Sequence, residues 1–63
     1  MSVTVRLTDG GIEDTNTRAL DFAVDESGAL SLLDKPATDE TADEIAIYAP
    51  GAWVRARVDA PQP

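Results

Sequence analysis

The sequence predicts an all-β fold, namely a five-stranded antiparallel meander that is curled into a small open barrel. Apolar and polar residues alternate with a period of two in several short runs, which is the pattern of strands with one buried face. Turn-forming residues separate these runs, among them Asp9-Gly10-Gly11 and Pro50-Gly51. Because short connections favour antiparallel pairing of sequence neighbours, we expect five successive strands, at residues 2–8, 18–24, 29–33, 43–49 and 52–58.

Length and composition limit the architecture. The 63 residues can form one domain, which we place at residues 1–58, with a frayed tail at residues 59–63. A chain this short buries about 60% of its unfolded surface, so we expect marginal stability. The sequence has no Cys and no His, which excludes disulfides and the commonest zinc ligands. Packing or self-association must then stabilise the fold, and a homodimer is expected as readily as a monomer.

The charge of the chain is strongly acidic. Twelve Asp and Glu residues against five Lys and Arg give a net charge of −7, which repels nucleic-acid phosphate and anionic lipid at long range. No run approaches the roughly 20 apolar residues of a membrane span, and the first residues lack the features of a secretory signal. We therefore expect a cytoplasmic protein without a membrane partner. The excess of Asp, Arg and Ala is typical of GC-rich genomes, such as those of actinobacteria, their phages or haloarchaea.

The first expected strand is followed by a loop. Val3, Val5 and Leu7 alternate with polar residues, as in a half-buried strand. The paired glycines at positions 10 and 11 end it, and the stretch up to Thr17 is polar apart from Ile12. We expect a loop there, with Ile12 folded back onto the edge of the core.

Residues 18–33 predict a hairpin for which two registers are open. A four-residue loop would scatter its large apolar side chains over both faces. A three-residue loop with Gly28 in the left-handed region places Val24 opposite Leu30 and groups the apolar side chains on one face. The same register places Phe22 opposite Leu32, and we expect this arrangement.

Two segments carry helical signals instead. Asn16 or Thr17 could cap a helix over residues 16–26, but Phe22 would then point away from its apolar stripe, so a strand is preferred. Residues 41–44 match the spacing of a capping box, although the alternation that follows is that of a strand.

The acidic loop at residues 34–44 is a candidate for cation binding. It contains five carboxylates and a single basic residue, Lys35, and hard cations prefer oxygen ligands. It lacks the glycine and the distal glutamate of the EF-hand loop. We therefore expect a solvated loop that protects a sheet edge, with no metal and no other cofactor.

The last third of the chain predicts a closing hairpin, with Pro50-Gly51 as a type II turn between its strands. One face of this hairpin would be aliphatic, and the other would be aromatic and charged. The aliphatic pairs would be Ile47 with Val54 and Ile45 with Ala56, and the other face would pair Tyr48 with Trp53, Ala46 with Arg55 and Glu44 with Arg57.

One side-chain parity of the five strands supplies a single apolar layer. No helix is expected to cover it, and a bare apolar face of this size is not expected on a soluble monomer. The sheet must therefore curl on itself or pack against a second copy. The layer consists of Val3, Val5, Leu7, Leu20, Phe22, Val24, Leu30, Leu32, Ile45, Ile47, Val54, Ala56 and Val58.

The sequence offers no catalytic machinery. Without Cys and His the usual pairs of nucleophile and base cannot form, and a chain this small has little room for a pocket. We expect a small non-enzymatic module that acts by protein–protein contact or self-association. Trp, Tyr and Arg are enriched at binding hot spots, so the expected partner-binding residues are Tyr48, Trp53, Arg55, Arg57 and Arg6.

Three alternatives remain open. The aromatic pair could simply stabilise the hairpin. The aromatic and Arg side chains could bind single-stranded nucleic acid, although the net charge of −7 opposes this. The acidic loops could imitate DNA and so occupy a basic, DNA-binding partner.

Overall fold

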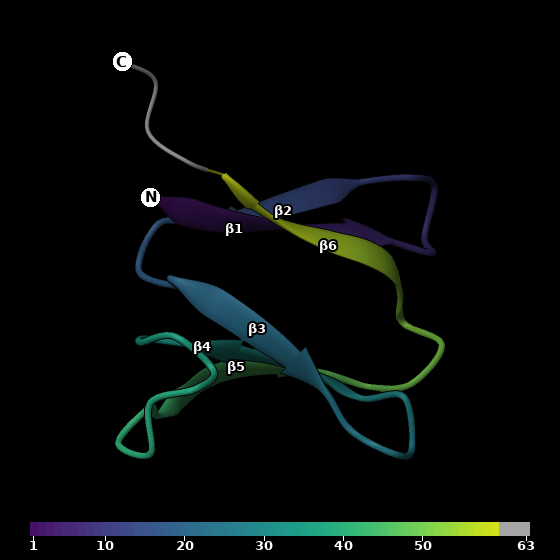
Figure 1. The fold of residues 1–63 in the computed structure, drawn as a ribbon. Coiled ribbons are helices and arrows are strands. Elements are labelled where there is room, and N and C mark those ends of the chain that lie inside the picture. The colour runs from purple at the N-terminus through teal and green to yellow at the C-terminus, as the bar shows by residue number, and fades with distance from the viewer. Residues whose placement is uncertain (60–63) are drawn as a thin grey trace.

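The computed structural model describes residues 1–59, and it is all-β, as the sequence predicts. Two three-stranded antiparallel sheets lie face to face (Figure 1). Sheet A has the order β2-β1-β6, and sheet B has the order β3-β4-β5. The strands are β1 (Ser2–Leu7), β2 (Glu13–Asn16), β3 (Asp21–Val24), β4 (Leu30–Leu33), β5 (Glu44–Tyr48) and β6 (Trp53–Asp59).

The five-stranded meander is not found. Residues 1–59 form one more strand than expected, in two separate sheets that do not close into a barrel. Of the expected neighbour pairs, β3–β4 and β4–β5 are confirmed. The first expected strand, β1, pairs instead with β2, which the sequence does not predict, and the chain passes between the sheets after β2 and after β5. Each sheet therefore covers the apolar face of the other, and no single apolar layer is left bare.

The expected closing hairpin does not form, although its turn does. The Ala52 amide donates to the Ala49 carbonyl at 3.0 Å, and Gly51 has φ 83°, as a type II turn requires. β5 pairs with β4, and β6 pairs with β1, so the expected pair of Tyr48 and Trp53 is absent. The twist of a type II turn does not suit a two-stranded hairpin, and here the turn leads the chain from one sheet to the other.

The strand that the sequence does not predict is β2. Its four residues are all polar, so it lacks the alternation that marks the other strands. It pairs with β1 over four residues, and the Thr15 and Thr4 hydroxyls are hydrogen-bonded at 3.0 Å. The expected loop at residues 9–17 is therefore wrong. Ile12 lies in the turn of the β1–β2 hairpin with 55% of its surface exposed and does not plug the core.

The β3–β4 hairpin has the predicted loop and register. Val24 lies opposite Leu30, and Phe22 lies opposite Leu32. Gly28 has φ 91°, which is the left-handed conformation that the three-residue loop needs. The large apolar side chains of this hairpin therefore share one face, which is turned toward sheet A.

Neither helical alternative forms within residues 1–59. Asn16 does accept hydrogen bonds from the amides of Arg18 and Ala19, as a helix cap would, but it does so in the connection between the sheets. Asp39 accepts from the amide and the hydroxyl of Thr41 in a similar local turn. The described residues thus contain no helix that could span a membrane.

The core between the sheets is small. Its buried apolar residues are Val3, Val5, Ala19, Leu30, Leu32 and Leu33. The partly buried residues packed against it are Leu7, Phe22, Ile45, Ala46, Tyr48, Trp53 and Ala56. Five residues expected in the core are exposed, namely Leu20, Val24, Ile47, Val54 and Val58.

These residues are exposed for different reasons. β5 lies opposite β4 in a register that pairs Ala46 with buried Leu32, so the alternate residue Ile47 points outward and is 64% exposed. Val58 pairs with buried Val3 and does face inward, but β6 is an edge strand and leaves it partly uncovered. β6 also includes Asp59, which was expected in the tail; the rest of that tail, residues 60–63, lies outside the described residues.

Candidate interaction surfaces

The predicted partner-binding residues do not form a single group. Arg6, Arg55 and Arg57 lie on the outer face of sheet A, because Arg6 pairs with Arg55 and alternates with buried Val5. We call these three residues the arginine face. Tyr48 lies on β5 of sheet B. The structure therefore brings the three arginines together, and places Tyr48 away from them.

Trp53 joins the two sheets. It begins β6 opposite Leu7, and its ring packs against the core. The indole Nε1–H donates to the Gly28 carbonyl at 2.9 Å, which is in the β3–β4 loop. A partly buried indole with a satisfied hydrogen bond is a structural contact. Tyr48 also packs against the core, so both predicted aromatic residues contribute to the fold.

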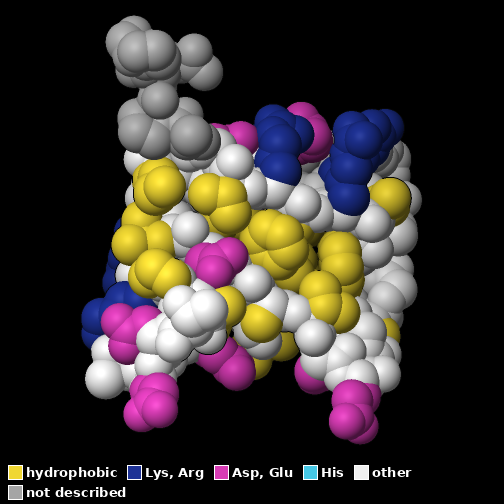
Figure 2. Space-filling model, in the orientation of Figure 1, with side chains coloured by type: hydrophobic (Ala, Val, Ile, Leu, Met, Phe, Trp, Pro, Cys, Tyr) yellow, Lys and Arg dark blue, Asp and Glu magenta, His cyan; other side chains and the backbone are white. Residues whose placement is uncertain are grey.

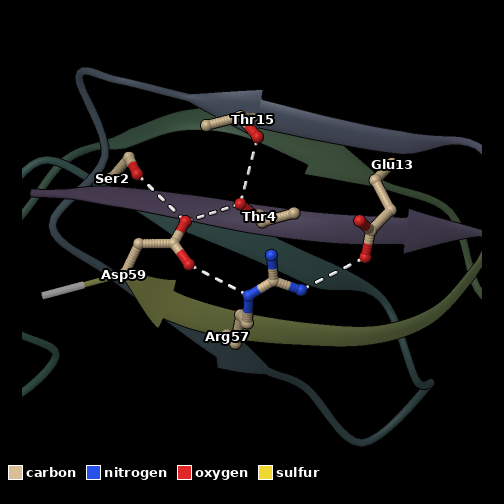
Figure 3. Close-up of polar contacts among 6 residues, drawn as sticks. All are labelled: Ser2, Thr4, Glu13, Thr15, Arg57 and Asp59. Atoms are coloured by element: carbon tan, nitrogen blue, oxygen red, sulfur yellow. Dashed lines mark hydrogen bonds and ion pairs between the residues drawn. The ribbon is translucent and has the colours of Figure 1, made fainter.

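Arg57 is the centre of a polar network across sheet A (Figure 3). Its Nη1 lies 3.1 Å from Glu13 Oε2, and its Nε lies 3.0 Å from Asp59 Oδ1. The other Asp59 oxygen accepts from the hydroxyls of Ser2 and Thr4. Thr4 is only 3% exposed beneath these groups, so the network connects all three strands of the sheet.

The charges of this network hold one another in the ionised form. Hydrogen bonds from Thr4 and Ser2, and the nearby Arg57 guanidinium, lower the pKa of Asp59 below its usual value of 3.8. The carboxylates of Asp59 and Glu13 raise the pKa of Arg57 in turn. Arg57 is therefore paired with a carboxylate from β2 and with another from its own strand.

Arg6 and Arg55 differ from Arg57. Among residues 1–59, both ion pairs belong to Arg57. Arg6 and Arg55 lie directly opposite each other and line a shallow hollow together with Gly11 and Val54. The Arg6 Nη2 would lie 3.2 Å from a Cβ at Gly11, which also has φ 73°, so a glycine is needed there. Within residues 1–59, neither of these two guanidinium groups has a carboxylate partner, so an anionic group could bind in this hollow.

One open side of the sandwich, between β2 and β5, is closed by polar groups. Asp14 faces inward, because it pairs with buried Val5. The Tyr48 hydroxyl lies beside it, and burial together with the Asp14 charge and hydrogen bond raises the pKa of Tyr48 above 10.0. We call this the polar side.

The opposite open side, between β3 and β6, is apolar. Val24 is 50% exposed and Val58 38%, although their cross-strand partners Leu30 and Val3 are fully buried. Figure 2 shows hydrophobic side chains gathered over the middle of this face, where β6 and β3 lie in Figure 1. We call this the apolar side, and it is formed by Leu20, Phe22, Val24, Ala56 and Val58.

The net charge is confined to one half of the sequence. Residues 21–50, which include all of sheet B, carry eight acidic residues and one Lys, a net charge of −7. The remaining residues, which include all of sheet A, carry four acidic residues and four Arg, a net charge of zero. In Figure 2, basic side chains lie along the upper rim and at the left, and most of the acidic ones lie in the lower half.

The part of the chain that the structure describes holds no group of three or more Asp and Glu placed to bind a metal ion. In the acidic loop, Asp34 instead accepts from the Asp43 amide at 2.9 Å, and Lys35 donates to the Thr41 carbonyl at 3.4 Å.

Comparisons with protein-family models, curated proteins and solved structures find no match to this chain.

The sequence contains the residues of the apolar side, but gives them another role. Their alternation marks them correctly as inward-facing, and all five were expected in the core. The period of two cannot show that β3 and β6 are edge strands. That depends on the pairing of β6 with β1, at the other end of the chain.

Proposed function

We propose that this protein is a small, acidic, non-enzymatic β module that acts by protein–protein contact, and that the contact is made through the apolar side. The observation that carries the proposal is the pair of half-exposed valines, Val24 and Val58, which continue the core layer out to the surface. Isolated surface hydrophobic residues are common, but a contiguous group that extends the core of a small protein is typical of an interaction site.

The physical basis is the removal of apolar area from water. Burial of such area is favourable by about 25 cal/mol per Å². The core itself contains few fully buried side chains, so covering Phe22, Val24 and Val58 would also add to the stability of the fold. Binding and folding are then thermodynamically linked, because a partner that binds only the native state stabilises it.

Site-specific photo-crosslinking in producing cells tests the proposal. A photoreactive residue at Val24 or Val58 should crosslink to protein, either a second copy or another chain. The same residue at Ile47 is the matched control, because Ile47 is 64% exposed but lies on the outer face of sheet B. Crosslinks from Ile47 that equal or exceed those from Val24 and Val58 would contradict the proposal.

A second candidate is favoured by the charge distribution. Since the whole net charge of −7 lies in residues 21–50, that half could bind a basic, DNA-binding protein by imitating a phosphate backbone. A photoreactive residue at Glu26 or Glu40 would then capture basic proteins, and added DNA would compete. Crosslinks at these positions that are insensitive to DNA would rule out this second function.

Binding of single-stranded nucleic acid has less support. A stacking platform needs aromatic rings beside basic groups, and Tyr48 lies on the other sheet from the arginine face. The Trp53 ring is engaged with Gly28. We expect no quenching of Trp53 fluorescence when an oligonucleotide is added at low salt, and saturable quenching would revive this alternative.

A further inference from the structure

We infer that the partner at the apolar side is a second copy of this chain, and that the two copies pair through the free edges of their β6 strands. The paired edges run antiparallel and join the two A sheets into one sheet of six strands. This inference rests on the proposed function, since it names the partner and the geometry of the same surface.

The four edges differ in the features that oppose strand pairing. β2 has an inward-facing charge, Asp14, β3 has only four residues, and β5 is interrupted by a bulge opposite Leu32/Leu33 and followed by Pro50. Short strands, inward charges, bulges and prolines are the devices that protect edges from pairing. β6 also has a bulge, at Val54, but its residues 55–59 pair with β1 without interruption and contain no Pro or Lys. Its inward-facing residues Ala56 and Val58 are apolar. It is therefore the edge best suited to pairing.

The hydrogen bonds of β1 show which groups of β6 are free. The Leu7 amide donates to Ile12, on the β2 side, and the Thr8 amide donates to Ala52, on the β6 side. Backbone groups alternate in direction along a strand, so the even-numbered residues of β1 face β6. They lie opposite the odd-numbered residues of β6, as Thr4 does opposite Arg57. The alternation is interrupted at Val54, where β6 has a bulge opposite Arg6 and Leu7. Beyond the bulge, the even-numbered residues of β6, namely Ala56 and Val58, direct their N–H and C=O groups away from β1.

Charge selects the register of the pairing. A two-fold axis at Arg57 places Arg55 of each copy opposite Asp59 of the other, and Ala56 opposite Val58. An axis at Ala56 would instead place Arg55 opposite Arg57 twice. Like charges directly opposite each other are unfavourable in a sheet, whereas opposite charges are favourable. In the preferred register the two Arg57 side chains meet at the axis, where each is already neutralised by Glu13 and Asp59.

The distribution of charge favours a second copy as the occupant. Two chains of net charge −7 repel each other, but the charge lies in residues 21–50, and the half that contains β6 has a net charge of zero. Pairing through β6 brings the uncharged halves together. β3 contacts β6 in the sandwich, so the two apolar sides would meet beneath the joined strands. A two-fold contact of this kind is closed and produces a dimer without further growth.

Single cysteines test the register, because the described residues contain no native Cys. In the predicted dimer, Ala56 of one copy lies opposite Val58 of the other, at a separation that a disulfide can bridge. A mixture of the A56C and V58C proteins should oxidise to the mixed disulfide more than tenfold faster than either protein alone. Equal rates for the mixture and the single proteins, or fastest dimerisation of A56C alone, would overturn the register and with it this inference.

Ala56→Pro tests the edge itself. Proline removes an N–H that is directed away from β1, and it leaves the hydrogen bonds of Thr4 and Arg6 to the neighbouring odd positions in place. Sedimentation velocity should show a dimer for the wild type and a monomer for the variant, with unchanged near-ultraviolet dichroism from Trp53. A wild type that is monomeric at millimolar concentration would overturn the inference. Crosslinks from Val24 and Val58 to a different protein would still support the proposed function in that case.

Discussion

The two open sides of the sandwich are closed in different ways. Between β2 and β5, an inward-facing carboxylate, Asp14, and the Tyr48 hydroxyl place polar groups where the core ends. Between β3 and β6, the core layer continues outward as Val24 and Val58. A side that ends in hydrogen-bonding groups is satisfied by itself and by water, whereas an apolar side gains free energy only when another surface covers it. This difference is the reason for which we propose the apolar side as the contact surface.

The largest effect is expected in the buried centre that both sides share. Leu32 has no exposed surface, whereas Val58 is 38% exposed at the apolar side. Leu32→Ala should lower the free energy of unfolding by about 2–5 kcal/mol, because it creates a cavity in a packed core. Val58→Ala should cost about 1 kcal/mol or less, measured by urea denaturation at a concentration where the chain is monomeric. Equal losses in the two variants would mean that Val58 is as buried as Leu32.

The second effect concerns the hydrogen bond that joins the sheets beside the apolar side. Trp53→Phe removes the indole N–H that donates to the Gly28 carbonyl at 2.9 Å. We expect a loss of about 1–2 kcal/mol, from the missing hydrogen bond and the smaller ring. Amide hydrogen exchange should also accelerate in the β3–β4 loop. A variant as stable as the wild type would contradict a structural role for Trp53.

The third effect tests the polar side. Tyr48→Phe removes the hydroxyl next to Asp14 and should cost about 0.5–1.5 kcal/mol at neutral pH. The raised pKa of Tyr48 means that its contribution to stability is complete below pH 10.0 and is lost as the pH rises above that value. The variant should therefore show a flatter loss of stability in alkali than the wild type. If the two proteins lose stability equally steeply at alkaline pH, the Tyr48 hydroxyl is not shielded from water at the polar side.

The smallest effect at neutral pH is expected for Asp59→Asn, in the network on the outer face of sheet A. The pKa of Asp59 is below its usual value of 3.8, so its contribution is present above that pH and is lost as the pH falls through the lower, folded-state pKa. Asp25, which accepts hydrogen bonds from Ser27 and Ala29, has a lowered pKa for similar reasons. The free energy of unfolding of Asp59→Asn should therefore fall less steeply in acid than that of the wild type. The same steepness in both proteins would contradict the role of the network.

The features predicted correctly from the sequence are those set by local chemistry. The β3–β4 register follows from Gly28 and from the grouping of Val24 with Leu30. The turn at Pro50-Gly51 forms as expected. The strand pairs on either side of that turn were wrong, because β6 finds its partner in β1 and not in its neighbour β5. A pairing between the two ends of the chain leaves no local mark in the sequence.

The candidate site was predicted only in part, for the same reason. The pairing of β6 with β1 brings Arg6 to Arg55 and leaves Tyr48 on the other sheet. β2 was missed because its residues are polar, since its strand conformation depends on hydrogen bonds to β1 and not on an apolar face. The apolar side was hidden among expected core residues, because the sequence shows which side chains face inward but not which strands lie at an edge.

The apolar side as the interface between copies is tested most directly by the oligomeric state of three proteins at matched concentration. The wild type is compared with the double variant Val24→Thr/Val58→Thr and with Ile47→Thr, which makes the same kind of change outside the apolar side at a residue that is 64% exposed. Threonine keeps the branched shape but places a hydroxyl at the contact, which is unfavourable when the contact is dry. Sedimentation velocity should give a dimer, a monomer and a dimer, in that order. The same state for all three proteins, or a weaker dimer only for Ile47→Thr, would contradict the account.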